Sequence, residues 1–159
     1  MVDIENHLCL ITQELPQPEN IKKPKAIRHH KPNIDDLHLK LMKLTGGNDH
    51  SQITGLTDST LLQIISEVGT NLSRFPTEKH FTSWLGLAPN SHQSGLTNKK
   101  KKFKRHTSAG QIFRLASQAI PQSKHLALTS FYHRIKARKG ALGAIKATDR
   151  KIAVIYYNV

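Results

Sequence analysis

The stretch Asp58-Ser-Thr-Leu-Leu-Gln-Ile-Ile-Ser-Glu-Val-Gly69 carries the clearest local pattern in this sequence. Its apolar side chains recur every three or four residues, which places them on one face of an α-helix; they are Leu61, Ile64, Ile65 and Val68. Asp58 is a suitable N-cap and Gly69 a suitable C-terminal stop. The pattern therefore predicts an amphipathic helix over residues 58–67 that packs against other apolar helix faces.

The same spacing on both sides of this stretch predicts further helices. Gly46-Gly47 would end the helix before it, and Gly86 the helix after it. Ser108-Ala-Gly-Gln111 has the form of a capping box, and Pro121 would close the helix that it opens. The helices expected besides the first span residues 35–44, 77–85, 108–120, 128–140 and 145–156. Since no segment alternates like a strand, we expect a mainly α fold, a small helical domain over residues 37–159.

Residues 1–36 are predicted to be an extended or disordered linker. They show no sustained apolar period, and four of the seven prolines lie among their lysines: Pro16, Pro18, Pro24 and Pro32. Proline fixes φ and removes a backbone donor, which disfavours both helix and sheet interiors.

The charge of the chain is concentrated in its second half. In 159 residues, 24 Lys and Arg stand against 11 Asp and Glu, a formal charge of +13. Residues 1–90 are nearly neutral, whereas residues 91–159 hold Asp149 as their one acidic residue. A one-sided excess of this size favours a polyanionic partner, because each phosphate that is neutralised releases counterions. From charge alone, a membrane surface and plain solubility remain open as alternatives.

The composition also limits the class of protein. No apolar run approaches the ~20 residues of a membrane-spanning helix, and the N-terminus lacks the pattern of a signal peptide. Cys9 is the single cysteine, which excludes an internal disulfide framework and a cysteine-rich zinc site. We therefore expect a cytoplasmic protein without a membrane partner.

Two segments are candidates for binding nucleic acid. Ile53-Thr-Gly-Leu-Thr57, followed by the predicted helix, is similar to a helix-hairpin-helix, in which backbone N–H groups at a helix N-terminus hold a phosphate. The usual turn is Gly-apolar-Gly, and Thr57 replaces the second glycine, so a tight turn between packed helices is the alternative. The candidate residues of this turn are Gly55, Leu56 and Thr57.

The second segment is Asn98-Lys-Lys-Lys-Lys-Phe-Lys-Arg105. Its cations repel one another, which suits a loop along a phosphate backbone, although such runs are often solvated surface. Phe103 could stack on a base or anchor the loop. The candidate phosphate contacts are Lys99, Lys100, Lys101, Lys102, Lys104 and Arg105.

Ser94-Gly95 precedes the basic run. A serine hydroxyl can attack a phosphodiester if a base removes its proton and cations stabilise the transition state. His92 could accept the proton, and the basic run could supply the charge. Ser-Gly pairs are also common in loops, so the pattern alone is weak. No His, Asp and Glu set has a clear metal-ligand spacing, so we predict no metal site.

Together these motifs resemble the C-terminal domain of the insertion-sequence 110/116/902 transposases. The likeness covers roughly residues 50–157, and its most specific part is Trp84-Leu-Gly-Leu-Ala-Pro89 with Ser94-Gly95 behind it. The other matching segments are Gly55-Leu-Thr57, Leu61 to Gly69, Arg74-Phe75, Phe81 to Ser83, His92-Gln93, Ser108-Ala-Gly110, Arg114, Phe131-Tyr132, Ala147 to Lys151 and Ile155-Tyr156.

The resemblance implies DNA transposition and recombination by phosphodiester exchange through a serine–DNA linkage, with Ser94 at the position of the nucleophile. Intact members pair this domain with a RuvC-like domain that binds metal through four acidic residues, are guided by a structured RNA, and act as multimers. Residues 1–50 are too short for a RuvC-like domain, so we expect a truncated member, with Mg²⁺ required only together with the missing domain.

We therefore expect a DNA-binding transposase fragment that is inactive alone, possible partners being a guide RNA and further copies of the chain. The alternative is a non-catalytic module from a decayed element that binds RNA or DNA.

Overall fold

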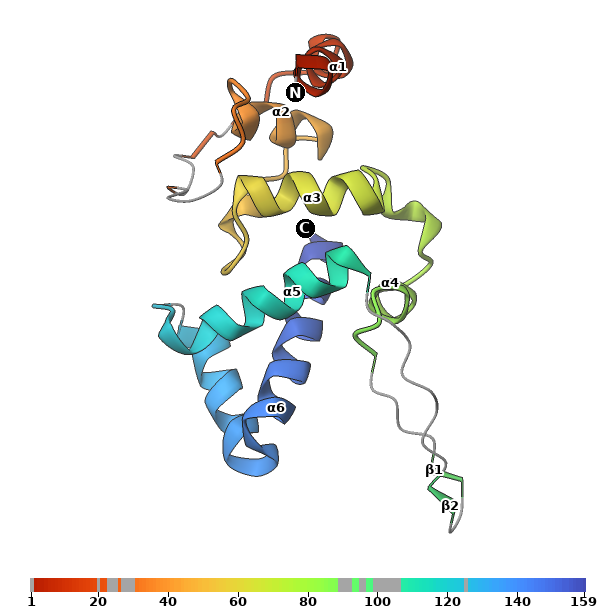
Figure 1. The fold of residues 1–159 in the computed structure, drawn as a ribbon, viewed down its shortest axis with the longest axis vertical. Coiled ribbons are helices and arrows are strands. Elements are labelled where there is room, and N and C mark those ends of the chain that lie inside the picture. Colours follow the sequence, from red (N-terminus) through yellow and green to blue (C-terminus); the bar gives the residue numbers. More distant parts are fainter. Residues whose placement is uncertain are drawn as a thin grey trace.

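The computed structural model describes residues 2–19, 21–22, 26, 31–88, 93–94, 97–98, 107–124 and 126–159. The described chain is mainly α, which confirms the predicted fold class (Figure 1). The helices are α1 (Val2–Gln13), α2 (Leu37–Leu44), α3 (Asp58–Val68), α4 (Glu78–Trp84), α5 (Ser108–Ala119) and α6 (Leu126–Asn158). Single 3₁₀ turns, η1 (His50–Gln52), η2 (Leu72–Arg74) and η3 (Ile120–Gln122), connect some of them, and β1 (Gln93–Ser94) pairs antiparallel with β2 (Thr97–Asn98).

Helix α3 forms where the apolar spacing predicts it, with Ile64 and Val68 buried against the core and Gly69 as its C-cap. The predicted N-cap is wrong by one residue. Thr57 is extended and forms a capping box with Thr60, whereas the Asp58 carboxylate lies 3.0 Å from Nδ1 of His38. The N-cap of α5 is likewise Thr107 instead of Ser108, because the Thr107 hydroxyl accepts a hydrogen bond from the Gly110 amide.

The core is built around aromatic side chains from α4, α5 and α6. Phe81 and Phe113 are fully buried, and their rings meet edge to face with centroids 6.3 Å apart. Tyr156 packs against both rings, and the Tyr157 hydroxyl donates to the carbonyl of Phe75 at 2.7 Å. These contacts hold the last turns of α6 against α4 and α5, and the C-terminus is seen between α3 and α5 in Figure 1.

Helix α6 is two helices joined at Gly140, in agreement with the two helices predicted from the sequence. Gly140 has φ 73° and ψ 175°, a conformation that is essentially restricted to glycine. The break lets residues 126–139 and residues 141–158 lie side by side, and Figure 1 shows them meeting at one end of the molecule. We call these segments the first and second halves of α6.

The prediction of an extended N-terminal segment is wrong for residues 2–13, which form α1. Ile4, Leu8 and Ile11 have helical spacing, and Pro16 follows the end of the helix, so proline does not interrupt it. Leu8 is buried, α1 contacts α2, and Leu8 lines an apolar pocket of about 430 Å³ together with Leu44 of α2 and Leu62 of α3. The division of the chain at residues 36 and 37 stays a prediction.

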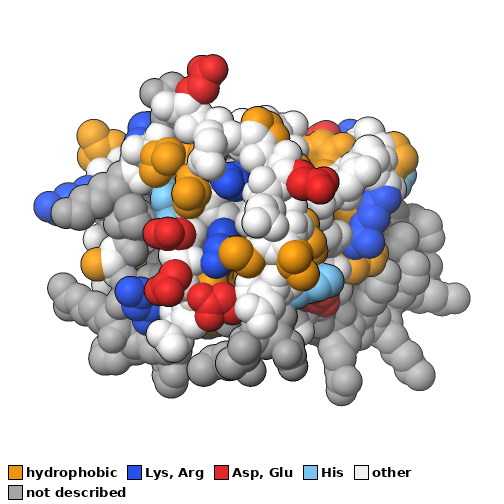
Figure 2. Space-filling model, turned by 90° about the horizontal axis from the view of Figure 1, so that it is seen from above, with side chains coloured by type: hydrophobic (Ala, Val, Ile, Leu, Met, Phe, Trp, Pro, Cys, Tyr) orange, Lys and Arg blue, Asp and Glu red, His pale blue; other side chains and the backbone are white. Residues whose placement is uncertain are grey.

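Acidic, basic and apolar side chains are mixed on the face seen in Figure 2, the α1 end of the molecule. This mixture matches the near-neutral composition of residues 1–90. Among the described residues of this face, charges of both signs therefore offset one another.

Candidate nucleic-acid interface

Ser94, the predicted nucleophile, lies in β1, where its backbone pairs with Thr97 of β2. Figure 1 shows this ladder away from the helical body and on the opposite side of the molecule from the turn before α3. The structure therefore does not bring Ser94 and the Gly55 turn together. His92 and the basic residues Lys99, Lys100, Lys101, Lys102, Lys104 and Arg105 lie outside the described residues.

Two backbone amides of the turn before α3 are engaged within the protein. The Leu56 N–H donates to the Ile53 carbonyl at 3.1 Å, and the Thr57 N–H donates to the Thr60 hydroxyl at 2.8 Å. Gly55 has φ 89°, and a Cβ added there would lie 2.9 Å from the carbonyl oxygen of Ala116 in α5. The glycine thus permits close packing of the turn on α5. The element that precedes this turn in the chain is the short 3₁₀ turn η1. Phosphate binding by Gly55, Leu56 and Thr57 stays a prediction.

Helix α6 carries a basic surface that sequence reasoning passed over. Seven of the fifteen cations of residues 91–159 lie on it, and six of these side chains are exposed. The exposed six are Arg134, Lys136, Arg138, Lys139, Lys146 and Lys151. The charge count of residues 91–159 contains this signal, but the cations of α6 are spread along the helix and form no contiguous motif like the run at 98–105.

The one acidic residue of this half, Asp149, is withdrawn from the surface. It is 1% exposed, and its Oδ2 accepts a hydrogen bond from Nε of Arg114 at 3.3 Å. Burial raises the pKa of Asp149 to about 6, although the nearby Arg114 guanidinium acts to lower it. Asp149 therefore joins α5 to the second half of α6, and of the six exposed cations Lys146 is near enough to act on its charge. Both residues belong to the matching segments, and this contact gives them a structural role.

The block around Trp84 and the segment 108–110 also meet in the structure. A Cβ added to Gly110 would lie 2.2 Å from the backbone oxygen of Leu85, so α5 approaches the end of α4 more closely than any larger residue allows. The Glu67 carboxylate accepts a hydrogen bond from the Ala109 amide, which adds a negative charge at the N-terminus of α5. Together these contacts fix both ends of the segment that carries Ser94.

Two histidines, His38 and His50, are buried. His38 lies between Asp58, at 3.0 Å, and Asp49, at 4.0 Å. His50 packs on Tyr156 with ring centroids 4.7 Å apart; burial lowers the pKa of His50 and raises the pKa of Tyr156 to about 12. Across the described ranges, no group of three or more His, Cys, Asp or Glu side chains is arranged to hold a metal ion.

The described helices include none with the length and apolar character that crossing a bilayer requires. No curated protein and no solved structure matches the chain. The family model described as "Transposase IS116/IS110/IS902 family" matches residues 50–132, just over half of the chain. The match begins before the turn at Gly55, contains Ser94, and ends in the first half of α6. The chain therefore belongs to the IS116/IS110/IS902 family of transposases.

Proposed function

We propose that this chain is the DNA-binding part of a transposase, and that it grips the sugar-phosphate backbone with α6 and the basic run of residues 98–105. A transposase must hold DNA while its strands are exchanged. The family supports a transposase-related role, and the surface of α6 supplies a physical means of binding.

The observation that carries the proposal is the unbalanced charge of α6. Its six exposed cations face solvent, while Asp149 is buried against Arg114. An array of exposed cations without nearby carboxylates attracts phosphates and gains free energy from counterion release. The α1 end of the molecule, where charges of both signs are mixed, provides an internal comparison (Figure 2).

In this proposal Ser94 stands where the family's nucleophile would lie. Its Oγ would attack a DNA phosphorus, the serine–phosphate bond would form as a bond from phosphorus to a sugar oxygen breaks, and the proton would pass to the departing oxygen. Mg²⁺ would be supplied together with the RuvC-like domain of intact relatives. We expect the chain alone to bind DNA without cleaving it; strand transfer by the isolated chain would overturn this part of the proposal.

The binding proposal is tested by the salt dependence of affinity for duplex DNA. Replacing Lys136, Arg138 and Lys139 with Gln removes three exposed cations of α6. If each contacts one phosphate, the slope of log affinity against log salt becomes shallower by about 2 to 3. A matched variant with Gln at Lys22, Lys40 and Lys79 loses the same charge from residues 1–90 and should keep the original slope. Equal effects of the two variants would show that α6 is not the binding surface.

The same basic surface would also accept RNA, since phosphates do not distinguish the two polymers. A non-catalytic module that prefers RNA is therefore the second candidate. Competition between duplex DNA and a structured RNA of equal charge separates the two: preferential displacement by DNA favours the transposase fragment, and preferential displacement by RNA favours the module.

A further inference from the structure

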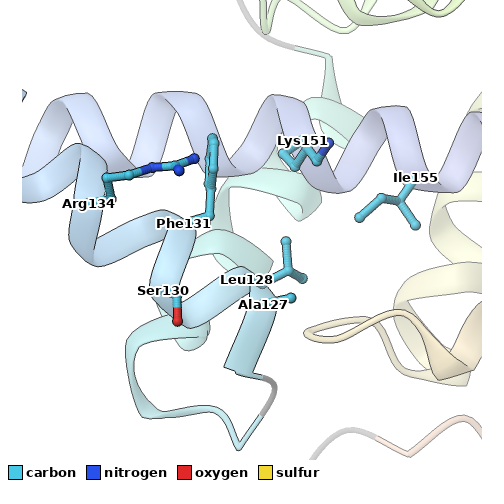
Figure 3. A pocket seen from close by; sticks show the side chains of 7 residues that line it. All are labelled: Ala127, Leu128, Ser130, Phe131, Arg134, Lys151 and Ile155. Carbon is cyan, nitrogen blue, oxygen red and sulfur yellow. The ribbon is translucent and has the colours of Figure 1, made fainter.

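A groove of about 390 Å³ lies along the two halves of α6 (Figure 3). Leu128 and Phe131 from the first half and Ile155 from the second give it an apolar lining. Arg134 and Lys151 stand at its edge, one from each half. This volume is at the lower end of the range of small-ligand sites, and none of the lining residues is acidic.

Phe131 is the main recognition element of the groove. Its ring stands between Arg134 and Lys151 in Figure 3, and the Arg134 guanidinium lies 5.7 Å from the ring centroid. The side chain is only partly buried, although other aromatic rings of the fold, such as Phe81 and Phe113, are fully enclosed. An aromatic ring between two cations offers a surface for stacking and charges for phosphates at the same place.

The chemistry of the groove selects among possible occupants. An apolar partner would cover two cations without supplying a counter-charge, which is unfavourable. Duplex DNA supplies phosphates, but its bases are stacked on one another and their faces are not available to Phe131. An unpaired nucleotide supplies both a free base face and phosphates within one small unit.

We infer that this groove binds one unpaired nucleotide of a single-stranded nucleic acid, its base stacked on Phe131 and its flanking phosphates held by Arg134 and Lys151. The inference rests on the proposed function, because it assigns part of the α6 surface a preference for unpaired strands. Such strands arise wherever a duplex is opened for strand exchange.

The experiment measures binding of the full chain to a short thymidine oligonucleotide and to a duplex of the same length. Phe131→Leu keeps an apolar side chain but removes the ring; it should weaken binding to the single strand about tenfold and leave duplex affinity within twofold. Phe131→Tyr keeps the ring and should retain single-strand affinity. Leu142→Ala, an exposed apolar change on α6 outside the groove, is the matched control and should alter neither.

A second readout reports stacking directly. An oligonucleotide with 2-aminopurine should lose fluorescence on binding the unaltered chain and keep more of it with Phe131→Leu. Replacing both Arg134 and Lys151 with Gln should make the single-strand salt slope shallower by about 1.4, at 0.7 for each phosphate lost. Thermal melting of each variant shows that the fold is intact.

The outcomes separate this inference from the proposal on which it rests. If the unaltered chain binds neither polymer, the proposed function fails. If it binds both, and Phe131→Leu leaves single-strand affinity unchanged or weakens both polymers equally, the groove inference fails while the basic surface stands. Unchanged affinity would point to a protein partner as the occupant of the groove.

Discussion

Replacing Gly140 with alanine should destabilise the protein through backbone strain alone. At φ 73° and ψ 175° an L-residue is strained by about 1–3 kcal/mol. A Cβ at this position would meet no atom within 4 Å, so no steric clash adds to this figure. Alanine also restricts the unfolded chain more than glycine does, which stabilises the folded state by about 0.4–1 kcal/mol. The free energy of unfolding should therefore fall by about 1–2 kcal/mol.

The fold does not allow α6 to relieve this strain by becoming one straight helix. A continuous helix of 33 residues would be about 50 Å long and would carry the first half away from the second. Leu128 and Tyr132 of the first half and Ile152 of the second would then leave the core. Because exposing these side chains costs more than the strain, the break should persist in the variant.

Urea denaturation followed by circular dichroism measures the effect. Leu142→Ala is a suitable control, because Leu142 is 67% exposed and its loss should change stability by less than about 0.5 kcal/mol. D-alanine, introduced at position 140 by chemical ligation, has the mirror-image preference and should restore the stability lost with L-alanine. An L-alanine variant as stable as the original chain would refute the reasoning, and failure of D-alanine to help would show that the cost is not conformational.

Three further predictions concern Gly110, Asp149 and Ser94. Gly110→Ala should lower the free energy of unfolding by about 1–3 kcal/mol, since the new Cβ would overlap the backbone oxygen of Leu85. Gln111→Ala, on the exposed side of α5, is the control and should have little effect. Equal urea midpoints for the two variants would contradict the close packing. Asp149→Asn should alter the pH dependence of unfolding. Because folding raises the pKa of Asp149 from 3.8 to about 6, this residue contributes up to about 3 kcal/mol to the free energy of unfolding below pH 4, and the contribution is lost as the pH rises through 6. The stability of the original chain relative to the variant should therefore fall across this window, and a difference that does not change with pH would argue against a raised pKa. Ser94→Ala should leave duplex affinity within twofold, as expected for a residue that reacts with DNA instead of anchoring it, and a large loss in a filter-binding assay would assign Ser94 to binding.

Most helices could be predicted because their apolar spacing and their stop residues indicate the same helix bounds. The pattern Leu61, Ile64, Ile65 and Val68 fixes both the existence and the buried face of α3. The sequence did not fix the cap position, since Thr57 and Asp58 are both good N-caps; the capping box, in which the Thr57 N–H donates to the Thr60 hydroxyl, decides between them. Helix α1 was missed because proline-rich sequence follows it directly, although Ile4, Leu8 and Ile11 carry the helical spacing.

The candidate site was less accessible from sequence than the fold. Ser94 and the run at 98–105 stand out as short contiguous motifs, whereas the exposed cations of α6 are spread over residues 134–151, and the sequence does not say which of them face solvent. The engagement of the Leu56 and Thr57 amides depends on local bonds that a motif does not specify. Likewise, no spacing rule connects Arg114 with Asp149, which lie on different helices.

The contact between Gly110 and the Leu85 carbonyl has a consequence for how this chain can change. A Cβ on Gly110, in the first turn of α5, would lie 2.2 Å from the backbone oxygen of Leu85 at the end of α4, so the two helix ends that flank the intervening segment are packed directly on each other. We therefore expect that residues 89–106 could be lengthened, shortened or exchanged for a brief glycine-serine bridge while α4 and α5 stay folded, so the length of the segment that carries Ser94 can vary independently of the helices that flank it.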